Sequence, residues 1–184
     1  MVDIAAANSP WAVILREKGI NAYRLDLGFP EGVHGIDIGA DATHTGLPDG
    51  FADALTLHCA FECLEGDADV RLFREADRLL ASGGMIALTP LYIDDIHFVM
   101  TCPELTLSEN AVEPEAMLLW RDDPWKVPFS RHYSPESFGR RIYDRLPPGM
   151  KGRVIFLENL EEAMTHWQNQ VLYAFFTFVA IKTS

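Results

Sequence analysis

Three acidic residues stand at places in the sequence where carboxylates commonly meet a ligand. Asp3 lies in the first apolar run, "VDIAAANSP", Asp26 follows 23 residues later in "AYRLDL", and Asp41 stands in "GADATHTGLP". Ligands of open α/β sheets bind at the carboxyl ends of the strands, where side chains from neighbouring strands converge. There, Asp26 can accept hydrogen bonds from a vicinal diol and Asp41 from an exocyclic amine, while the backbone N–H of Ala42 can donate to a ring nitrogen.

A second group of reactive residue types follows a later apolar run, in "HCAFEC". His58 and Cys59 suggest a nucleophile, but no Asp or second His is visibly placed to activate a thiol, and buried cysteines usually pack as small apolar residues. The single C-x3-C spacing of Cys59 and Cys63 lacks the paired spacing of structural zinc sites, so we predict no metal. If the reaction needs a hydroxyl group to be deprotonated, His58 and His132 are the candidate general bases.

Alternating strand and helix patterns must position these residues. Ser9 is expected to cap the first helix with Pro10 at its first position, Gly19 to end it, and Ser134 to cap a later helix that begins at Pro135. The expected strands are Val2–Ala7, Asn21–Leu27, Gly35–Ala40, Ala52–Phe61, Met85–Ile93, Arg153–Glu158 and Leu172–Lys182, and the expected helices are Pro10–Lys18, Asp69–Leu80 and Pro135–Leu146. This order favours right-handed crossovers and a doubly wound, mostly parallel sheet that ends in an antiparallel pair.

The pattern loosens over about residues 94–133, which we interpret as an insertion or lid within one domain covering residues 1–184. Its aromatic and basic residues either contact a substrate or form a small core of the insertion. Both interpretations stay open at this point. The candidate substrate-binding residues are Trp120, Trp125, Arg131 and Tyr133, with His132 beside them.

Composition narrows the function classes. The formal net charge of -12 argues against recognition of a nucleic-acid backbone. Three cysteines fit a reducing, cytoplasmic location better than a disulfide framework. No apolar stretch is long enough to suggest a membrane span, and the N-terminus lacks the basic region of a signal peptide. We therefore expect an acidic, soluble protein with no membrane or nucleic-acid partner, and a homo-oligomer stays open.

The order of these landmarks resembles that of the class I S-adenosylmethionine-dependent methyltransferases over nearly the whole chain. The family has an acidic residue in the first strand, another at the end of the second, and an acidic residue with a small apolar neighbour before an "LP" turn; Asp3, Asp26 and the Asp41-Ala42 pair match these positions. The family also shows a helix ending in "RxLxxGG" before a strand, matched by "RLLASGGM" at residues 78–85.

The resemblance implies a Rossmann-like, seven-stranded sheet and S-adenosyl-L-methionine as the cofactor. Methyl transfer depends mainly on holding the acceptor and the methyl group close and in line, so no obligatory catalytic residue is expected. The implied acceptor is a small, metabolite-like molecule, and the alternative is a non-catalytic module that uses the same fold for binding. The implied cofactor-binding residues are Asp3, Ala5, Ala7, Asp26, Asp41, Ala42 and His58.

The first turn departs from the family. Ala5, Ala7 and Ser9 stand where the family commonly has three glycines, which permit positive φ and close approach to a ligand. Alanines are accommodated if the turn keeps ordinary, negative φ values. A nicotinamide dehydrogenase is disfavoured because its phosphate-binding turn needs those glycines. Met1 stands directly before the first strand, where the family usually has helices, so either a preceding segment is missing or the pocket is unusually open.

Overall fold

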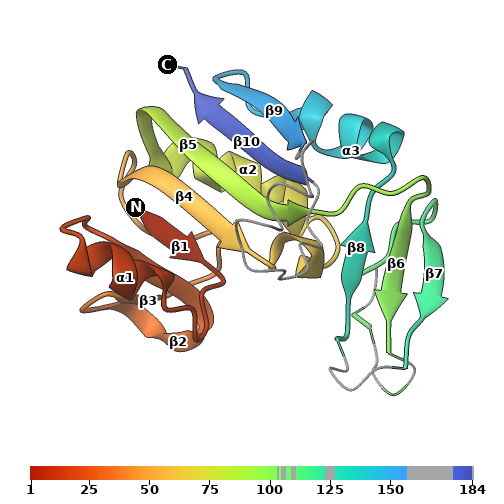
Figure 1. The fold of residues 1–184 in the computed structure, drawn as a ribbon, viewed down its shortest axis with the longest axis horizontal. Coiled ribbons are helices and arrows are strands. Elements are labelled where there is room, and N and C mark those ends of the chain that lie inside the picture. The colour runs from red at the N-terminus through yellow and green to blue at the C-terminus, as the bar shows by residue number, and fades with distance from the viewer. Residues whose placement is uncertain (103, 105–106, 109–110, 123–126, 157–175, 184) are drawn as a thin grey trace, which may run out of the picture.

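A seven-stranded sheet forms the centre of the computed structural model, which describes residues 1–102, 104, 107–108, 111–122, 127–156 and 176–183 (Figure 1). Its strand order is β3-β2-β1-β4-β5-β10-β9. β1 pairs in parallel with β2 and β4, β4 pairs in parallel with β5, and β10 pairs antiparallel with β5 and β9. The predicted sheet with a closing antiparallel pair is confirmed. The strands are β1 Val2–Ile4, β2 Tyr23–His34, β3 Asp37–Gly39, β4 Ala52–His58, β5 Leu80–Leu91, β9 Met150–Phe156 and β10 Phe176–Lys182.

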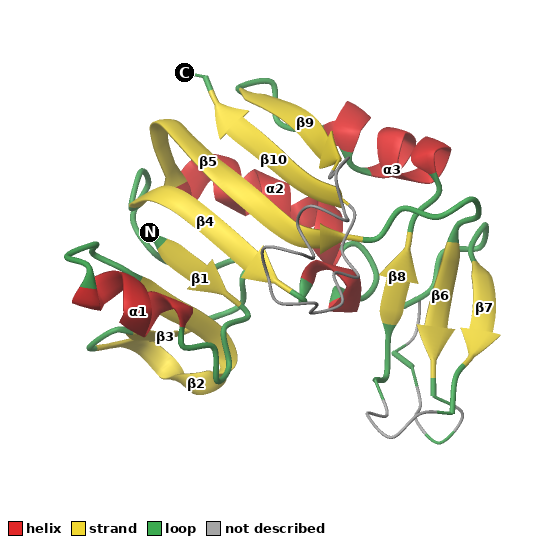
Figure 2. Ribbon diagram, viewed as in Figure 1, coloured by secondary structure: helices red, strands yellow, loops and turns green. Residues whose placement is uncertain are grey.

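The helices cover both faces of this sheet. Figure 2 shows α1 (Trp11–Glu17) in front of the strands and α2 (Ala68–Leu79) behind them. The apolar stripe of α2, including Phe73 and Leu79, packs in one core cluster with Leu55 of β4 and Leu88 of β5. This core lies between α2 and the sheet, and it holds the ends of the central strands in place.

The first helix begins one residue later than predicted. Pro10 stands at the N-cap position, where it has no side chain that could cap the helix. The Ser9 hydroxyl, one residue earlier, accepts a hydrogen bond from the Trp11 N–H at 3.3 Å and donates one to Asp3 Oδ2 at 2.8 Å. The predicted end is confirmed: Gly19 has φ +80°, and the N–H of Ile20 reaches back to the carbonyl of Leu15, as in a Schellman motif.

The helix before the closing strands starts as predicted. In α3 (Pro135–Arg141), Ser134 accepts a hydrogen bond from the Ser137 N–H, and the Ser137 side chain accepts one from the Ser134 N–H. Pro135 occupies the first position, where its missing N–H costs nothing. The helix ends at Arg141, earlier than predicted, and a 3-10 turn (Tyr143–Arg145) follows it.

The second strand is much longer than predicted. We expected it to end at Leu27, but β2 continues to His34 and folds back beside β3, placing Val33 opposite Ile38. Gly39 makes this crossing possible, since a Cβ there would lie 2.0 Å from the Pro30 carbonyl oxygen. The fold therefore has a β hairpin at this edge of the sheet.

The insertion contains its own small sheet, in the order β7-β6-β8, seen to the right of the main sheet in Figure 1. Its strands are β6 Phe98–Thr101, β7 Met117–Trp120 and β8 Ser130–His132. β6 pairs in parallel with β7 and antiparallel with β8. Among the described residues, no helix is long and apolar enough to cross a bilayer.

A buried ion cluster fastens the insertion to the main fold. The Asp69 carboxylate at the start of α2 accepts hydrogen bonds from Tyr133 and Arg141, both at 2.6 Å, and lies 3.1 Å from Arg131 Nη1. Glu113 forms ion pairs with the same two arginines, at 2.7 Å and 3.1 Å. Burial would raise the pKa of Glu113, but His97 and the arginines outweigh burial and lower it to about 2.

A second polar cluster holds the loop between β3 and β4 against α2. Glu75 Oε1 accepts hydrogen bonds from the backbone N–H and the hydroxyl of Thr45, at 2.8 Å and 2.6 Å. Arg78 donates to Glu75, to the Leu47 carbonyl at 2.6 Å and to Asp49 at 2.7 Å. Arg78, the arginine of the "RxLxxGG" pattern, and Glu75 thus hold the turn at Leu47 and Pro48 in place, and we call this pair the clamp.

We predict that this clamp makes stability fall in acid. Burial raises the pKa of Glu75, but hydrogen bonds from Arg78 and Thr45 outweigh it and lower the pKa to about 2 from 4.5. The ionised carboxylate therefore favours the folded protein above about pH 4.5, and this contribution disappears as the pH falls toward 2. In urea unfolding experiments between pH 7 and pH 2, the free energy of unfolding should fall less steeply with falling pH in Glu75→Gln than in the wild type. Glu17→Gln, an exposed change on α1, is the control, and equal pH profiles for E75Q and wild type would contradict the assignment.

Candidate functional site

Four of the predicted ligand-binding residues line a single cavity of about 440 Å³, at the edge where β1 and β3 end and the first part of β2 (Tyr23–Asp26) leads into the hairpin. They are Ala5, Asp26, Asp41 and Ala42. The volume lies within the usual range for small-molecule and cofactor sites. The full lining is Ala5, Leu25, Asp26, Leu27, Ala40, Asp41, Ala42, Thr43, Cys63, Leu64, Glu65, Ala68 and Arg71.

Asp26 is fixed by the backbone on both sides. Its Oδ2 accepts a hydrogen bond from the Ala7 N–H at 2.9 Å, and its Oδ1 accepts one from the Gly28 N–H at 2.8 Å. Each carboxylate oxygen can accept a further hydrogen bond. The side chain is therefore an oriented acceptor on the cavity wall, suited to a pair of hydroxyl groups.

Asp41 lies just after β3 and is exposed. Its Oδ1 accepts a hydrogen bond from the Thr43 N–H at 2.8 Å, an arrangement typical of a turn residue. The turn role and the ligand role are compatible here, because the side chain also lines the cavity beside Ala42.

The cavity wall carries more negative than positive charge. Three carboxylates, Asp26, Asp41 and Glu65, face one guanidinium, Arg71. Arg71 is held by Asp67 at 2.9 Å and donates to Thr43 at 3.0 Å. Such a wall favours a ligand with a net positive charge.

The alanine turn has the backbone of a glycine turn. Ala5 has φ 53° and Ala7 has φ 35°, so the condition of ordinary, negative φ values is not met and the scaffold holds both alanines in the left-handed region. The chain must turn sharply after Ile4 for the Ala6 N–H to reach the Leu25 carbonyl and the Ala7 N–H to reach Asp26. These contacts impose the left-handed conformation, which costs an alanine about 1 kcal/mol. The Ala5 side chain lines the cavity and leaves it open.

Comparison with known proteins agrees with this geometry. A family model described as a methyltransferase domain matches residues 3–88, which contain every residue that lines the cavity. No curated protein matches the chain. The chain has the class I methyltransferase fold. The resemblance to class I S-adenosylmethionine-dependent methyltransferases is thereby confirmed, by the family model over residues 3–88 and by the fold of the described residues.

Three solved structures illustrate the methyltransferase fold. One is 1,6-didemethyltoxoflavin-N1-methyltransferase from Burkholderia thailandensis, 10% identical, with a TM-score of 0.61 over 100% of this chain and 70% of that one. A second is an S-adenosylmethionine-dependent methyltransferase from Mesorhizobium loti, 17% identical, with a TM-score of 0.57 and coverages of 98% and 89%. The third is geranyl diphosphate C-methyltransferase from Streptomyces coelicolor A3(2), 11% identical, with a TM-score of 0.53 and coverages of 100% and 70%.

Asp3 and His58 lie outside the cavity lining of this methyltransferase fold. Asp3 is buried and accepts hydrogen bonds from Ser9 at 2.8 Å and Thr56 at 3.0 Å. It therefore links the end of the alanine turn to β4 and stabilises the turn without lining the cavity. His58 Nε2 lies 3.9 Å from Asp3 Oδ1, and its ring meets Trp11 edge-on at 6.0 Å. His58 is therefore near the turn, beside β4's carboxyl end, but the structure does not bring it together with Asp26 and Asp41.

Most of the candidate residues in the insertion are placed elsewhere. Arg131 and Tyr133 are buried in the ion cluster around Asp69, so of the two interpretations left open for them, packing agrees with their contacts and substrate binding does not. Trp120 is 62% exposed on β7. Trp125 lies outside the described residues. His132 is stacked between Tyr92 and Phe98, with ring centroids 4.6 Å and 4.5 Å away.

The far wall of the cavity, formed by the loop after β4 and the start of α2, was not predicted from the sequence. Cys63, Leu64, Glu65, Ala68 and Arg71 belong to it. Their position after the fourth strand, at the same sheet edge, was the available signal. Burial, with Glu62 and Cys59 nearby, raises the pKa of the Cys63 thiol to about 11, which keeps it neutral and poorly nucleophilic. The described residues contain no group of three His, Cys, Asp or Glu side chains arranged to hold a metal ion.

We predict that glycine at position 5 or 7 stabilises the protein. Ala5→Gly and Ala7→Gly each replace an alanine held at positive φ, which removes its steric cost in the folded protein. The greater freedom of glycine in the unfolded chain offsets part of this gain, so the free energy of unfolding should rise by up to about 1 kcal/mol. Chemical denaturation measures the change.

The control is Ala6→Gly between them. Ala6 is buried and is not among the residues with positive φ. Glycine there should lower the free energy of unfolding, since it removes a packed methyl group and adds chain entropy. Equal destabilisation by all three substitutions would show that the turn is not strained.

Proposed function

We propose that this protein is an S-adenosylmethionine-dependent methyltransferase that acts on a small-molecule acceptor. The observation that carries the proposal is the convergence of Ala5, Asp26, Asp41 and Ala42, which come from three adjacent strands and the turns after them, on one open cavity. The bound small molecules named for two structural neighbours, 1,6-didemethyltoxoflavin and geranyl diphosphate, support the class of acceptor. The acidic surface supports the exclusion of nucleic acid as a partner.

The cavity fits the cofactor in size, polarity and charge. Asp26 offers two oriented oxygens for the ribose diol, Asp41 an acceptor for the adenine amino group, and Ala42 a backbone N–H for a ring nitrogen. Leu27 and Leu64 supply apolar contacts for the purine. The net negative wall favours a ligand that carries a sulfonium. That sulfonium supplies the transferable methyl group, and the protein's task is to bind, orient and exclude water.

Of the two candidate bases, His58 is the better placed. Its side chain is 40% exposed, and its Nε2 lies 3.9 Å from Oδ1 of the buried Asp3. His132 is only 12% exposed and donates to Asp94 at 2.8 Å, and burial lowers its pKa despite that partner. We therefore propose that His58 takes a proton from an acceptor hydroxyl, with Trp11 as the neighbouring surface for the acceptor.

A non-catalytic methyltransferase-like module is the alternative. Its support is the alanine turn, which replaces the family's glycines. The open cavity disfavours it, because neither Ala5 nor Ala7 fills the space and Trp11 packs against His58 instead. Cofactor binding separates the two proposals.

We predict that S-adenosylhomocysteine binds and that Asp26→Ala weakens its binding by about 1 to 3 kcal/mol, through lost charge-assisted hydrogen bonds. Isothermal titration calorimetry measures both. Asp144→Ala, which removes an exposed carboxylate in the 3-10 turn after α3, is the matched control and should bind like the wild type. The methyltransferase proposal fails if neither S-adenosylmethionine nor S-adenosylhomocysteine binds at millimolar concentration.

We further predict that His58→Gln lowers turnover by about 100-fold or more on hydroxylated acceptors, the usual size of a general-base effect. Release of S-adenosylhomocysteine from a panel of small hydroxylated compounds is the assay. The affinity for S-adenosylhomocysteine should not change, because His58 does not line the cavity. His34→Gln, on the exposed hairpin, is the control. A pH-rate profile that is the same in H58Q and wild type would remove His58 as the base.

A further inference from the structure

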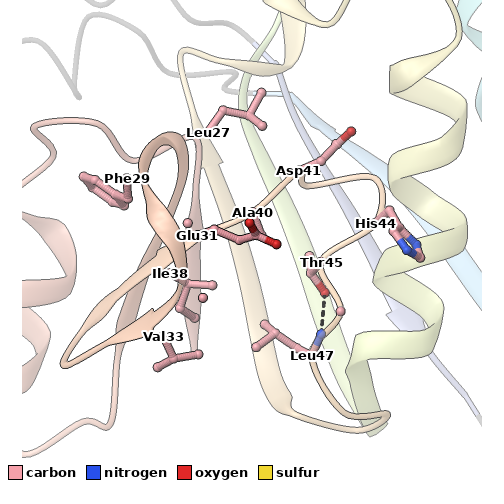
Figure 3. A pocket seen from close by; sticks show the side chains of 13 residues that line it. Leu27, Phe29, Glu31, Val33, Ile38, Ala40, Asp41, His44, Thr45 and Leu47 are labelled. Carbon is pink, nitrogen blue, oxygen red and sulfur yellow. Dashed lines mark hydrogen bonds between the residues drawn. The ribbon is translucent and has the colours of Figure 1, made fainter.

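A second cavity, of about 540 Å³, lies beside the first, between the β2 hairpin and the loop after β3 (Figure 3). The two cavities share Leu27, Ala40 and Asp41 as a common wall. None of the residues proposed to hold the ribose lines the second cavity. Its lining is Leu27, Phe29, Glu31, Gly32, Val33, Ile38, Gly39, Ala40, Asp41, His44, Thr45, Gly46 and Leu47.

The second cavity exists because of two features already described. β2 continues past Asp26 and returns beside β3, which supplies one wall. Gly39 lets the hairpin backbone pass close to β3, because a Cβ at residue 39 would lie 2.0 Å from the Pro30 carbonyl oxygen. The opposite wall, at Thr45 and Leu47, is held by the Glu75 and Arg78 clamp. Both walls are therefore set by specific contacts.

The lining combines an apolar body with a negative rim. Ile38 and Leu47 are buried at its base, whereas Leu27 is 77% exposed and Val33 is 53% exposed. Large aliphatic side chains this exposed around a cavity are available to cover a ligand. Phe29 adds an aromatic surface, with the Arg24 guanidinium 5.4 Å from its ring centroid.

The charged lining residues are carboxylates. Figure 3 shows the Glu31 side chain extending from the hairpin toward Thr45, into the space between the two walls. Within the described part of the chain, the Glu31 carboxylate makes no hydrogen bond or ion pair. Asp41 adds a second negative charge, and the lining contains no Lys or Arg. A cation is the ligand head group that this wall fits.

We propose that the second cavity binds an amphipathic organic cation, with its ammonium group at Glu31 and its aliphatic or aromatic body against Leu27, Val33, Ile38 and Leu47. This ligand is distinct from both the cofactor and the acceptor. Its binding does not require the cofactor, so the proposal stands or falls separately from the proposed function.

Calorimetry with hexylammonium chloride tests the proposal. The wild type should bind hexylammonium more tightly than 1-hexanol, which has the same body without the charge, and should not bind hexanoate. Glu31→Gln should weaken hexylammonium binding at least about tenfold, through the loss of one charge-assisted hydrogen bond. Glu17→Gln on α1 is the matched control and should bind like the wild type.

Three results would overturn the proposal: no binding of hexylammonium by the wild type at millimolar concentration, equal binding by E31Q and wild type, or equal affinity for hexylammonium and hexanol. Affinity for S-adenosylhomocysteine should be the same in E31Q and wild type; a loss of that affinity as well would show that the two cavities are one site. Gly39→Ala, checked for folding by circular dichroism, should displace the hairpin and also weaken hexylammonium binding.

Discussion

The Asp69 carboxylate is the contact on which the rest of the structure depends. It is completely buried, and it meets the hydroxyl of Tyr133 and the guanidinium groups of Arg131 and Arg141. The same arginines reach the carbonyls of Leu64 and Gly66, in the loop that forms the far wall of the first cavity. A buried charge without partners is strongly destabilising, so all these segments must assemble together. The insertion, α3 and the cavity wall are therefore positioned by one cluster.

The sheet and the near wall of the first cavity could be predicted from sequence because their signals are local. Apolar runs separated by Gly, Pro and capping residues indicate the strands along the chain, and the doubly wound pattern places Asp26, Asp41, Ala5 and Ala42 at one edge of the sheet. The Ser134 cap could be predicted for the same reason, since its partner lies three residues away.

Other features depend on contacts between distant residues and could not be predicted. The segment "LGFPEGVH" contains glycines and a proline, which are rare in strands, so its pairing with β3 was hidden. Whether Arg131 and Tyr133 contact a substrate or pack in a core could not be decided from the sequence, because their partner, Asp69, lies more than sixty residues earlier. The positive φ of Ala5 and Ala7 is imposed by contacts with the second strand, whereas local preference alone favours negative φ.

The hairpin of β2 has a consequence for the surface of the sheet. The outermost segment on that side is the short stretch from Glu31 to His34, and within it Gly32 has φ 95°. Long, flat edge strands offer unpaired backbone groups to other chains and promote aggregation. A four-residue edge that contains a left-handed glycine and follows Pro30 is a poor template for an added strand. The hairpin thus protects this side of the protein against edge-to-edge association.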